Sequence, residues 1–98
     1  MQVNYRNRQI EKICTNASAA TKKYGKRTAG LIHQRVDEIY AAVSVEMLVQ
    51  FGIGRCHRLA GNRKGQYAMD LEHPLRLIFE VSGDEIQIAE NQDIVDYH

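Results

Sequence analysis

The sequence predicts an α+β domain in which N-terminal helices pack on one face of a small, mainly antiparallel, twisted sheet. Two observations carry this prediction. Apolar residues recur at helical spacing through residues 7–51, and from residue 55 onward the apolar period falls towards two, which is typical of half-buried strands. Helices followed by antiparallel strands are typical of an α+β layer pair. The length of 98 residues predicts one domain, residues 1–98.

The N-terminal half is expected to form a short strand and three helices. Residues 3–6 suit the strand, and residues 7–24 suit a helix that stops at Gly25. A longer helix is predicted over residues 27–43, with an apolar stripe of Ile32, Val36, Ile39, Tyr40 and Val43. Ser44 is expected to cap a short helix that turns three apolar side chains to the core, namely Met47, Leu48 and Phe51.

The C-terminal half is expected to form strands separated by polar turns. Strands are predicted over residues 66–71 and 75–81, each with one face on the core. The turn at residues 82–84 leads to a last strand that begins at Ile86 and is interrupted near residues 91–93. This pattern makes consecutive antiparallel hairpins the expected connection.

Charge is unevenly distributed along the chain. Residues 1–64 hold 12 Lys and Arg against 4 Asp and Glu, whereas residues 65–98 hold 1 against 8. This asymmetry indicates an anionic partner, although basic helices that pair with acidic strands inside the fold would give the same pattern.

The other compositional features narrow the class of protein. No apolar run approaches the ~20 residues of a membrane span, so we expect a cytoplasmic protein with no membrane partner. Cys14 and Cys56 are expected to be free and partly buried. No clustered ligand spacing is present, so neither a metal nor a cofactor is expected. His33 lies beside the apolar stripe and is interpreted as structural.

The segment from Arg55 to Val81 brings basic and imidazole groups beside a glycine-bounded turn. Several of its motifs, together with the chain ending, resemble the RelE/HigB superfamily of toxins from type II toxin–antitoxin systems. The matching stretches are Cys-His-Arg-Leu at 56–59, Gly-Asn-Arg-Lys-Gly-Gln-Tyr at 61–67, Arg-Leu-Ile-Phe at 76–79, and Ile-Val-Asp-Tyr-His at 94–98. The final Asp-Tyr-His resembles the ending of the HigB branch.

This resemblance implies a fold, an activity and partners. The fold would be RelE-like. The activity would be a ribosome-dependent mRNA endonuclease that uses the ribose 2′-hydroxyl against the adjacent phosphate, without a metal, and so inhibits translation and growth. The implied partners are a cognate HigA-like helix-turn-helix antitoxin, the ribosome and mRNA, with operator DNA contacted only through the antitoxin.

The resemblance also implies site residues. His57 and His98 are the acid–base candidates, with no assignment between them, because the ordinary pKa of histidine lies near operating pH. Arg76 would clamp the phosphate, since its planar fork binds two oxygens. A salt bridge from Arg76 to Glu80, or to an acid on a neighbouring strand, is the structural alternative.

The remaining candidates would support substrate binding. Asp96 would orient a histidine or accept a proton, and Tyr97 would stack on a base. Arg58, Arg63 and Lys64 would hold the RNA backbone, although a merely charged turn explains the last two equally well.

Two departures from the family pattern leave other functions open. Ala60 stands where many members carry lysine, and Pro74-Leu75 precedes Arg76 where others carry an aromatic or polar residue. The alternatives are a ParE-like toxin that poisons gyrase, or a catalytically weak member that binds its antitoxin.

Overall fold

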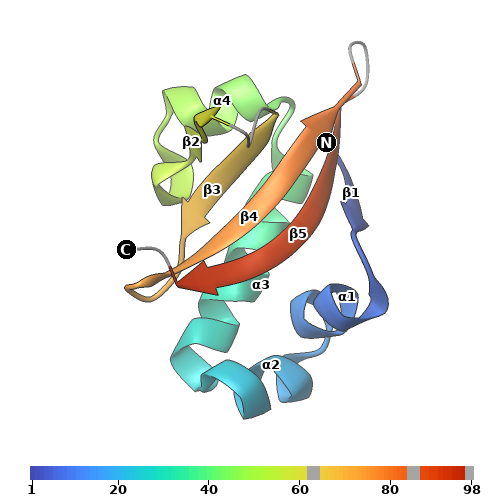
Figure 1. Cartoon of the computed structure of the whole chain (residues 1–98), viewed down its shortest axis with the longest axis vertical. Helices are drawn as coiled ribbons and strands as arrows, with labels where there is room; N and C mark the ends of the chain where they lie inside the picture. The colour runs from blue at the N-terminus through green and yellow to red at the C-terminus, as the bar shows by residue number, and fades with distance from the viewer. Residues whose placement is uncertain (62–64, 84–86, 97–98) are drawn as a thin grey trace.

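A computed structural model describes residues 1–61, 65–83 and 87–96 of the chain. Its helices lie behind one face of a five-stranded sheet, which confirms the predicted α+β class (Figure 1). The elements in chain order are β1 (Gln2–Tyr5), α1 (Arg8–Thr15), α2 (Ala17–Tyr24), α3 (Lys26–Ala41), α4 (Val45–Gln50), η1 (Ile53–Arg55), β2 (His57–Arg58), β3 (Gln66–Asp70), β4 (Leu75–Ser82) and β5 (Ile88–Asp96).

The sheet has the strand order β1-β5-β4-β3-β2. β1 runs parallel to β5, and the other neighbouring pairs are antiparallel. The two-residue strand β2 was not predicted, because so short a strand has no apolar period to read. No helix in the described part of the chain is long and apolar enough to cross a membrane.

The predicted helix over residues 7–24 is in fact two helices. The chain breaks at Asn16, whose φ of −119° and ψ of 108° are extended. The Asn16 side chain accepts a hydrogen bond from the backbone N–H of Ala19 at 3.0 Å, just as Asn7 accepts one from Ile10 at 2.9 Å. Asparagine is a strong N-cap, so Asn16 starts a second helix instead of continuing the first.

The apolar stripe of α3 is narrower than predicted. Ile32 and Ile39 are fully buried, but Tyr40 is 70% exposed and Val43 is 82% exposed. Val43 lies beyond the last residue of α3, so it no longer follows the helical period. Phe51 is likewise 68% exposed, because it follows the end of α4 at Gln50.

The short helix α4 otherwise forms as expected. The Ser44 hydroxyl accepts the backbone N–H of Met47 at 3.3 Å and so caps its first turn. Leu48 is fully buried and Met47 is half-buried. The capping residue and one core side chain were therefore correctly predicted, whereas Phe51 was not.

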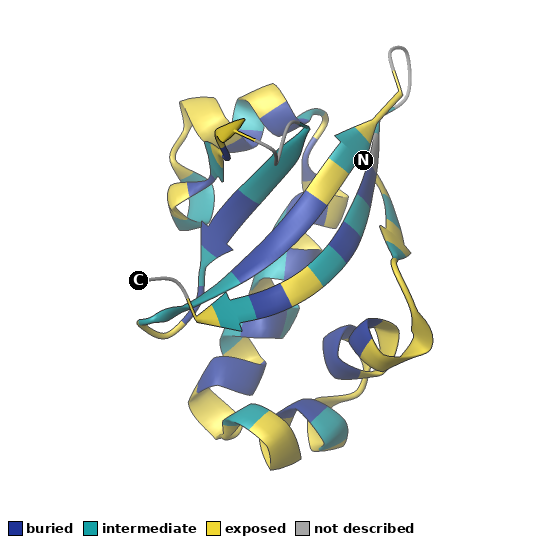
Figure 2. Cartoon of the chain, viewed as in Figure 1, coloured by how far each residue is buried: buried dark blue, intermediate teal, exposed yellow. Residues whose placement is uncertain are grey.

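The main core lies between the helices and the sheet (Figure 2). Phe79 at its centre is fully buried and stacks on Tyr67, with ring centroids 5.7 Å apart. A second, smaller cluster lies on the other face of the sheet, where Leu59, Ala68 and Ile78 pack together. The prediction of one buried face is therefore wrong for the middle of β3 and β4, which are buried on both sides.

The interruption predicted near residues 91–93 appears as a β-bulge inside β5. Ile78 pairs with Asp93 and Phe79 pairs with Asn91, which leaves Gln92 as the extra residue. β5 continues beyond the bulge to Asp96. The predicted strand start at Ile86 lies outside the described residues.

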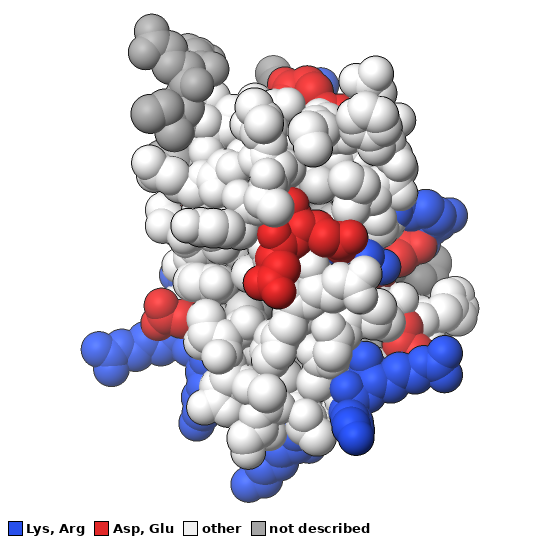
Figure 3. All heavy atoms as spheres, turned by 180° about the vertical axis from the view of Figure 1, so that it is seen from behind, with Lys and Arg blue, Asp and Glu red and all other residues white. Residues whose placement is uncertain are grey.

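Salt bridges between the two halves of the chain account for part of the charge asymmetry. Arg27 on α3 pairs with Glu72, and Arg55 pairs with Asp70 on β3. On the helix side, acidic side chains lie in the middle while lysine and arginine lie at the lower end and both flanks (Figure 3). One basic residue of a helix thus meets an acid in the turn after β3, and one in η1 meets an acid of β3, which agrees in part with the structural alternative.

His33 has the structural role expected of it. Its Nε2 lies 3.3 Å from the backbone carbonyl of Ile13 and so links α3 to α1. Because a carbonyl oxygen only accepts, Nε2 carries the proton in this contact.

We expect the protein to lose stability at alkaline pH because its two free thiols are buried. Cys14 and Cys56 are both buried, and burial raises the pKa of each thiol from 9.0 to about 12. The unfolded chain therefore loses the two thiol protons at a lower pH than the folded chain does. The contribution of the buried thiols to the stability of the fold is complete below pH 9.0 and is lost as the pH rises towards about 12. We expect a loss on the order of 1 kcal/mol per thiol near pH 10.

Urea denaturation at about pH 8 and about pH 10 measures this effect. The double variant Cys14→Ala, Cys56→Ala should lose less stability between the two conditions than the wild type. Equal losses in both proteins would contradict the prediction.

Candidate functional site

Polar side chains gather on the face of the sheet that the helices leave uncovered. His57 pairs with Ala68 on β3, and Arg76 pairs with Asp70. Opposite residues in an antiparallel pair share a face, and Ala68 belongs to the cluster on the helix-free face. His57, Asp70 and Arg76 therefore lie on that face.

The register separates Arg58 from His57. Arg58 pairs with Tyr67, which packs against the main core with Phe79. Successive residues of a strand point to opposite faces, so Arg58 lies on the helix-covered side of the sheet.

Two arginines and one histidine line the same hollow. Arg55, His57 and Arg76 line a shallow, open depression of about 300 Å³. An adjoining hollow of about 500 Å³ shares both arginines and extends over Asp70 and the turn at Pro74. Both hollows are open to solvent, so a ligand there would meet the two guanidinium groups at the surface of the sheet.

Asp70 connects the two arginines. Its Oδ2 accepts a hydrogen bond from Nε of Arg55 at 2.6 Å, and its Oδ1 lies 3.3 Å from Nε of Arg76. The structural alternative for Arg76, a salt bridge to an acid on a neighbouring strand, is therefore present. A carboxylate shared by two guanidinium groups holds both in place while leaving the trio with one net positive charge.

The imidazole of His57 is oriented by the backbone. Its Nδ1 lies 2.9 Å from the carbonyl oxygen of Arg55. A carbonyl only accepts, so Nδ1 carries the proton and Nε2 of the neutral ring is left with a lone pair. This arrangement suits a group that takes up a proton.

Arg55 reaches this position through an unusual backbone conformation. Its φ of 52° is left-handed, and it follows Gly52 and Gly54, which have φ values of 62° and 58°. A non-glycine residue in this region is strained, and such strain is concentrated at functional sites. The same turn aims the Arg55 carbonyl at His57 and its guanidinium at Asp70.

The other predicted site residues are only partly placed. Asp96 ends β5 opposite Leu75, which packs against the main core, so the register places Asp96 on the helix-covered side of the sheet and not beside His57 and Arg76. Four further candidates lie outside the described residues, namely Arg63, Lys64, Tyr97 and His98. Within residues 1–61, 65–83 and 87–96, no three His, Cys, Asp or Glu residues group in a way that suits a metal ion.

Arg55 and Asp70 were missed from the sequence. The signal for Arg55 was the Gly-Ile-Gly that precedes it, because glycines at alternate positions favour a left-handed turn. Asp70 gave no signal of its own, since its partnership with Arg76 depends on the register between β3 and β4.

Arg35 supports this site from the helix side. Its Nε donates to the backbone carbonyl of Asp70 at 2.7 Å, and its Nη1 donates to Glu38 at 2.8 Å. A methyl group built on Gly54 would lie 2.8 Å from Nε of Arg35. Gly54 therefore leaves room for the arginine that holds the backbone of Asp70.

Replacing Gly54 by alanine is expected to destabilise the protein and displace Arg35. The left-handed backbone alone costs an L-residue roughly 1–2 kcal/mol, and the clash adds to that cost. Gly52→Ala is the matched control, because its φ is also left-handed but nothing lies within 4 Å of the added carbon. Urea denaturation should show Gly54→Ala as the less stable variant, and equal stabilities would contradict the role of Arg35.

Comparisons with known proteins support the fold. No protein-family model matches the chain, and no curated protein matches it. Among solved structures, a YoeB/ParE toxin from Agrobacterium tumefaciens matches with a TM-score of 0.68 at 14% identity, over 100% of both chains. The YoeB dimer from Staphylococcus aureus matches with a TM-score of 0.62 at 18% identity, over 100% of this chain and 97% of that one. The fold of this chain is therefore the RelE-like α+β fold of the YoeB/ParE toxins.

Proposed function

We propose that this protein is the toxin of a type II toxin–antitoxin system and that it cleaves mRNA on the ribosome. The observation that carries the proposal is the hollow shared by Arg55, His57 and Arg76, with the imidazole held by the Arg55 carbonyl. The RelE-like fold supports the toxin assignment. The Asp-Tyr-His motif at residues 96–98 resembles one of the HigB branch, which is the branch we propose.

In the proposed reaction, Nε2 of His57 takes the proton from a ribose 2′-hydroxyl. The 2′-oxygen then bonds to the adjacent phosphorus, and the bond from phosphorus to the 5′-oxygen breaks. The products are a cyclic phosphate and a 5′-hydroxyl, whose proton comes from His98 as the acid. Asp96 orients a histidine, and Tyr97 stacks on a base.

The two arginines of the hollow stabilise the phosphate. Arg76 and Arg55 present guanidinium groups where negative charge grows on the phosphoryl oxygens. Asp70 keeps both arginines ordered before RNA arrives, which limits reorganisation during the reaction. Arg58, Arg63 and Lys64 hold the RNA backbone away from the reacting bond.

The same proposal names partners and location. A HigA-like helix-turn-helix antitoxin, encoded beside the gene, inhibits the toxin and carries it to operator DNA. The free toxin acts in the cytoplasm on mRNA bound to ribosomes. Purification from the native operon should therefore recover a second small chain.

Two observations favour other members of the superfamily. One structural relative is described as a YoeB/ParE toxin, so a ParE-like function that poisons gyrase is the second candidate for this protein. The shared salt bridges of Asp70 reduce the charge of the hollow, which favours a catalytically weak, antitoxin-binding member.

Inducible expression in a bacterium, followed by mapping of transcript 5′ ends, tests these three functions. New 5′-hydroxyl ends within translated reading frames, dependent on His57, support the nuclease. DNA damage without such ends supports the ParE alternative. Unchanged growth and transcripts at confirmed expression support the weak member and contradict the nuclease.

A further inference from the structure

Asp70 is held in place from two sides. Its Oδ1 lies 3.3 Å from Nε of Arg76, the residue opposite it in the ladder between β3 and β4. On the helix side, Nε of Arg35 donates to the backbone carbonyl of Asp70 at 2.7 Å. Strand pairing and these two arginines therefore fix the position of the carboxylate before any ligand binds.

Arg55 is tied to this fixed carboxylate by two hydrogen bonds. Its Nε donates to Oδ2 of Asp70 at 2.6 Å, and its Nη2 donates to Oδ1 at 3.4 Å. The side chain of Arg55 is 67% exposed, whereas that of Arg76 is 20% exposed. An exposed arginine loses side-chain entropy when it becomes ordered, so the two-point contact with Asp70 gives Arg55 its defined orientation.

The same salt bridge supports the strained backbone of Arg55. Its φ of 52° is left-handed, a conformation that costs an L-residue free energy and persists only where surrounding contacts over-determine it. The backbone N–H of Arg55 donates to the carbonyl of Gly52 at 3.0 Å, and the guanidinium is anchored to Asp70. Loss of the carboxylate would remove one of these supports and favour an ordinary backbone conformation at Arg55.

The backbone carbonyl of Arg55 selects the tautomer of His57. It lies 2.9 Å from Nδ1 of the ring, which places the proton on Nδ1 and the lone pair on Nε2. The direction of this carbonyl depends on the backbone angles of Arg55. If the turn relaxed, the imidazole would lose the acceptor that selects its tautomer, and either nitrogen would carry the proton.

We infer that Asp70 is a positioning residue for His57 and that it acts through Arg55. The carboxylate holds the guanidinium, the guanidinium supports the left-handed turn, and the turn aims the carbonyl that keeps the proton on Nδ1. The importance of this tautomer for cleavage rests on the proposed function, because only an unprotonated Nε2 takes up the proton of a 2′-hydroxyl. The tautomer itself is a property of the protein without RNA.

The first test measures the tautomer of His57 from the nitrogen chemical shifts of its ring, in the full chain without RNA. At about pH 8 an ordinary histidine is mostly neutral, so the two tautomers are distinguishable. We expect a single Nδ1–H form in the wild type. Asp70→Asn should give a mixture of both forms, because the amide keeps the shape of the side chain but loses the charge that anchors Arg55.

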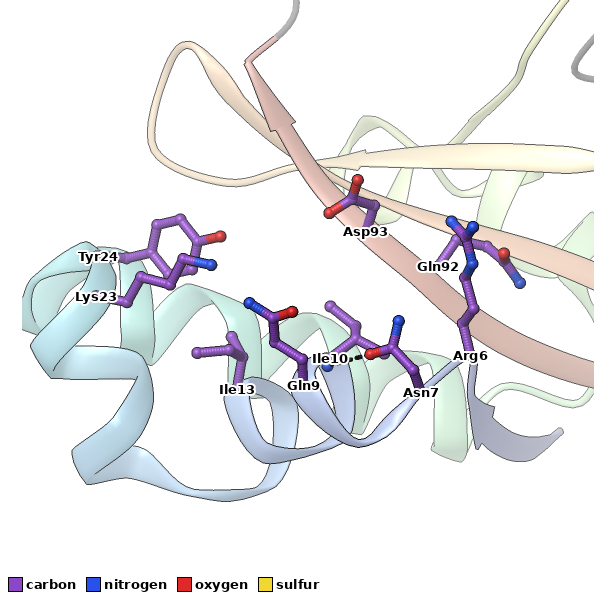
Figure 4. Close-up of a pocket in the computed structure, with 9 residues that line it drawn as sticks. All are labelled: Arg6, Asn7, Gln9, Ile10, Ile13, Lys23, Tyr24, Gln92 and Asp93. Carbon is purple, nitrogen blue, oxygen red and sulfur yellow. Dashed lines mark hydrogen bonds between the residues drawn. The ribbon is translucent and has the colours of Figure 1, made fainter.

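Asp93→Asn is the matched control for Asp70→Asn. It makes the same substitution, with the same change in net charge, on the same sheet. Asp93 lines a separate pocket of about 230 Å³ between α1, α2 and β5, which shares no lining residue with the hollow at His57 (Figure 4). This variant should keep the tautomer of the wild type.

Two substitutions of Arg55 separate the turn from the charge. Arg55→Ala removes the anchor and leaves a residue that disfavours a left-handed backbone, so the tautomers of His57 should mix. Arg55→Gly also removes the anchor, but glycine adopts a positive φ without steric cost, so the turn and the single Nδ1–H form should remain. If Asp70→Asn does not fold, these two variants decide the inference.

The second test separates RNA affinity from the chemical step. Asp70→Asn adds one positive charge to the hollow, which favours RNA binding, so the concentration of ribosome-bound mRNA at half-saturation should not rise. The single-turnover rate at saturation should nevertheless fall by about 10–100-fold, because the proton acceptor is no longer held in its productive form.

Four results would overturn the inference. They are a single Nδ1–H form that persists in Asp70→Asn, an equal mixture of tautomers in Asp93→Asn, the same tautomer ratio in Arg55→Ala and Arg55→Gly, and a faster chemical step in Asp70→Asn. The last result would mean that the carboxylate only screens the arginines. A wild-type protein that cleaves no RNA would contradict the proposed function and leave the tautomer measurements to decide the role of Asp70.

Discussion

Replacing His57 by glutamine is expected to slow RNA cleavage by about 10²–10⁴-fold, the usual contribution of general acid–base catalysis. The glutamine amide keeps a donor for the Arg55 carbonyl that His57 Nδ1 contacts at 2.9 Å. It has no group that accepts a proton near neutral pH. The variant should therefore fold normally and bind RNA while losing the chemical step.

The measurement is single-turnover cleavage of ribosome-bound mRNA, with growth inhibition at matched expression. His33→Gln is the control, because it makes the same substitution at a histidine that links α3 to α1, away from the hollow. Its cleavage rate should match the wild type. Full activity in His57→Gln would place the proton acceptor elsewhere.

Replacing Arg76 by alanine is expected to reduce the cleavage rate by about 10²–10³-fold, the usual cost of losing one donor to a developing charge. The fold should survive, because Asp70 keeps its salt bridge with Arg55. The loss should appear in the chemical step more than in RNA affinity, since the arginine is expected to bind the transition state more strongly than the ground state.

Arg27→Ala is the matched control for Arg76. Arg27 also uses its Nε in a salt bridge, with Glu72 at 3.2 Å, but its side chain is 85% exposed and does not line the hollow. Its removal should leave the rate unchanged. If Arg76→Ala unfolds in circular dichroism or thermal melting, then the role of Arg76 is structural.

The local pattern of the sequence was sufficient for most of the helices and strands and for part of the site. Ser44 caps α4 as predicted, because a cap depends on residues three positions apart. The polar residues near position 91 correctly marked an irregularity in β5, which is the bulge at Gln92. His57 and Arg76 were identified from motifs within the chain, and the structure brings both to one hollow.

Two predictions were wrong because the same local pattern is compatible with more than one structure. Asn16 reads as a tolerated residue in a long helix, but its side chain caps a new one. Phe51 follows the apolar period of α4, but the helix ends one residue earlier and leaves it exposed. Periodicity indicates which residues share a face and does not show where the element stops.

The sequence by itself determined the order of helices and strands, because apolar periods of 3.6 and two are properties of neighbouring residues. Only the tertiary structure decided the arrangement of the site. Asp70 meets Arg76 through the register of two strands, and it meets Arg55 because a left-handed turn carries that guanidinium over the sheet. Strand register and turn direction result from packing across the whole sheet, so contacts between distant residues become visible only in the folded chain.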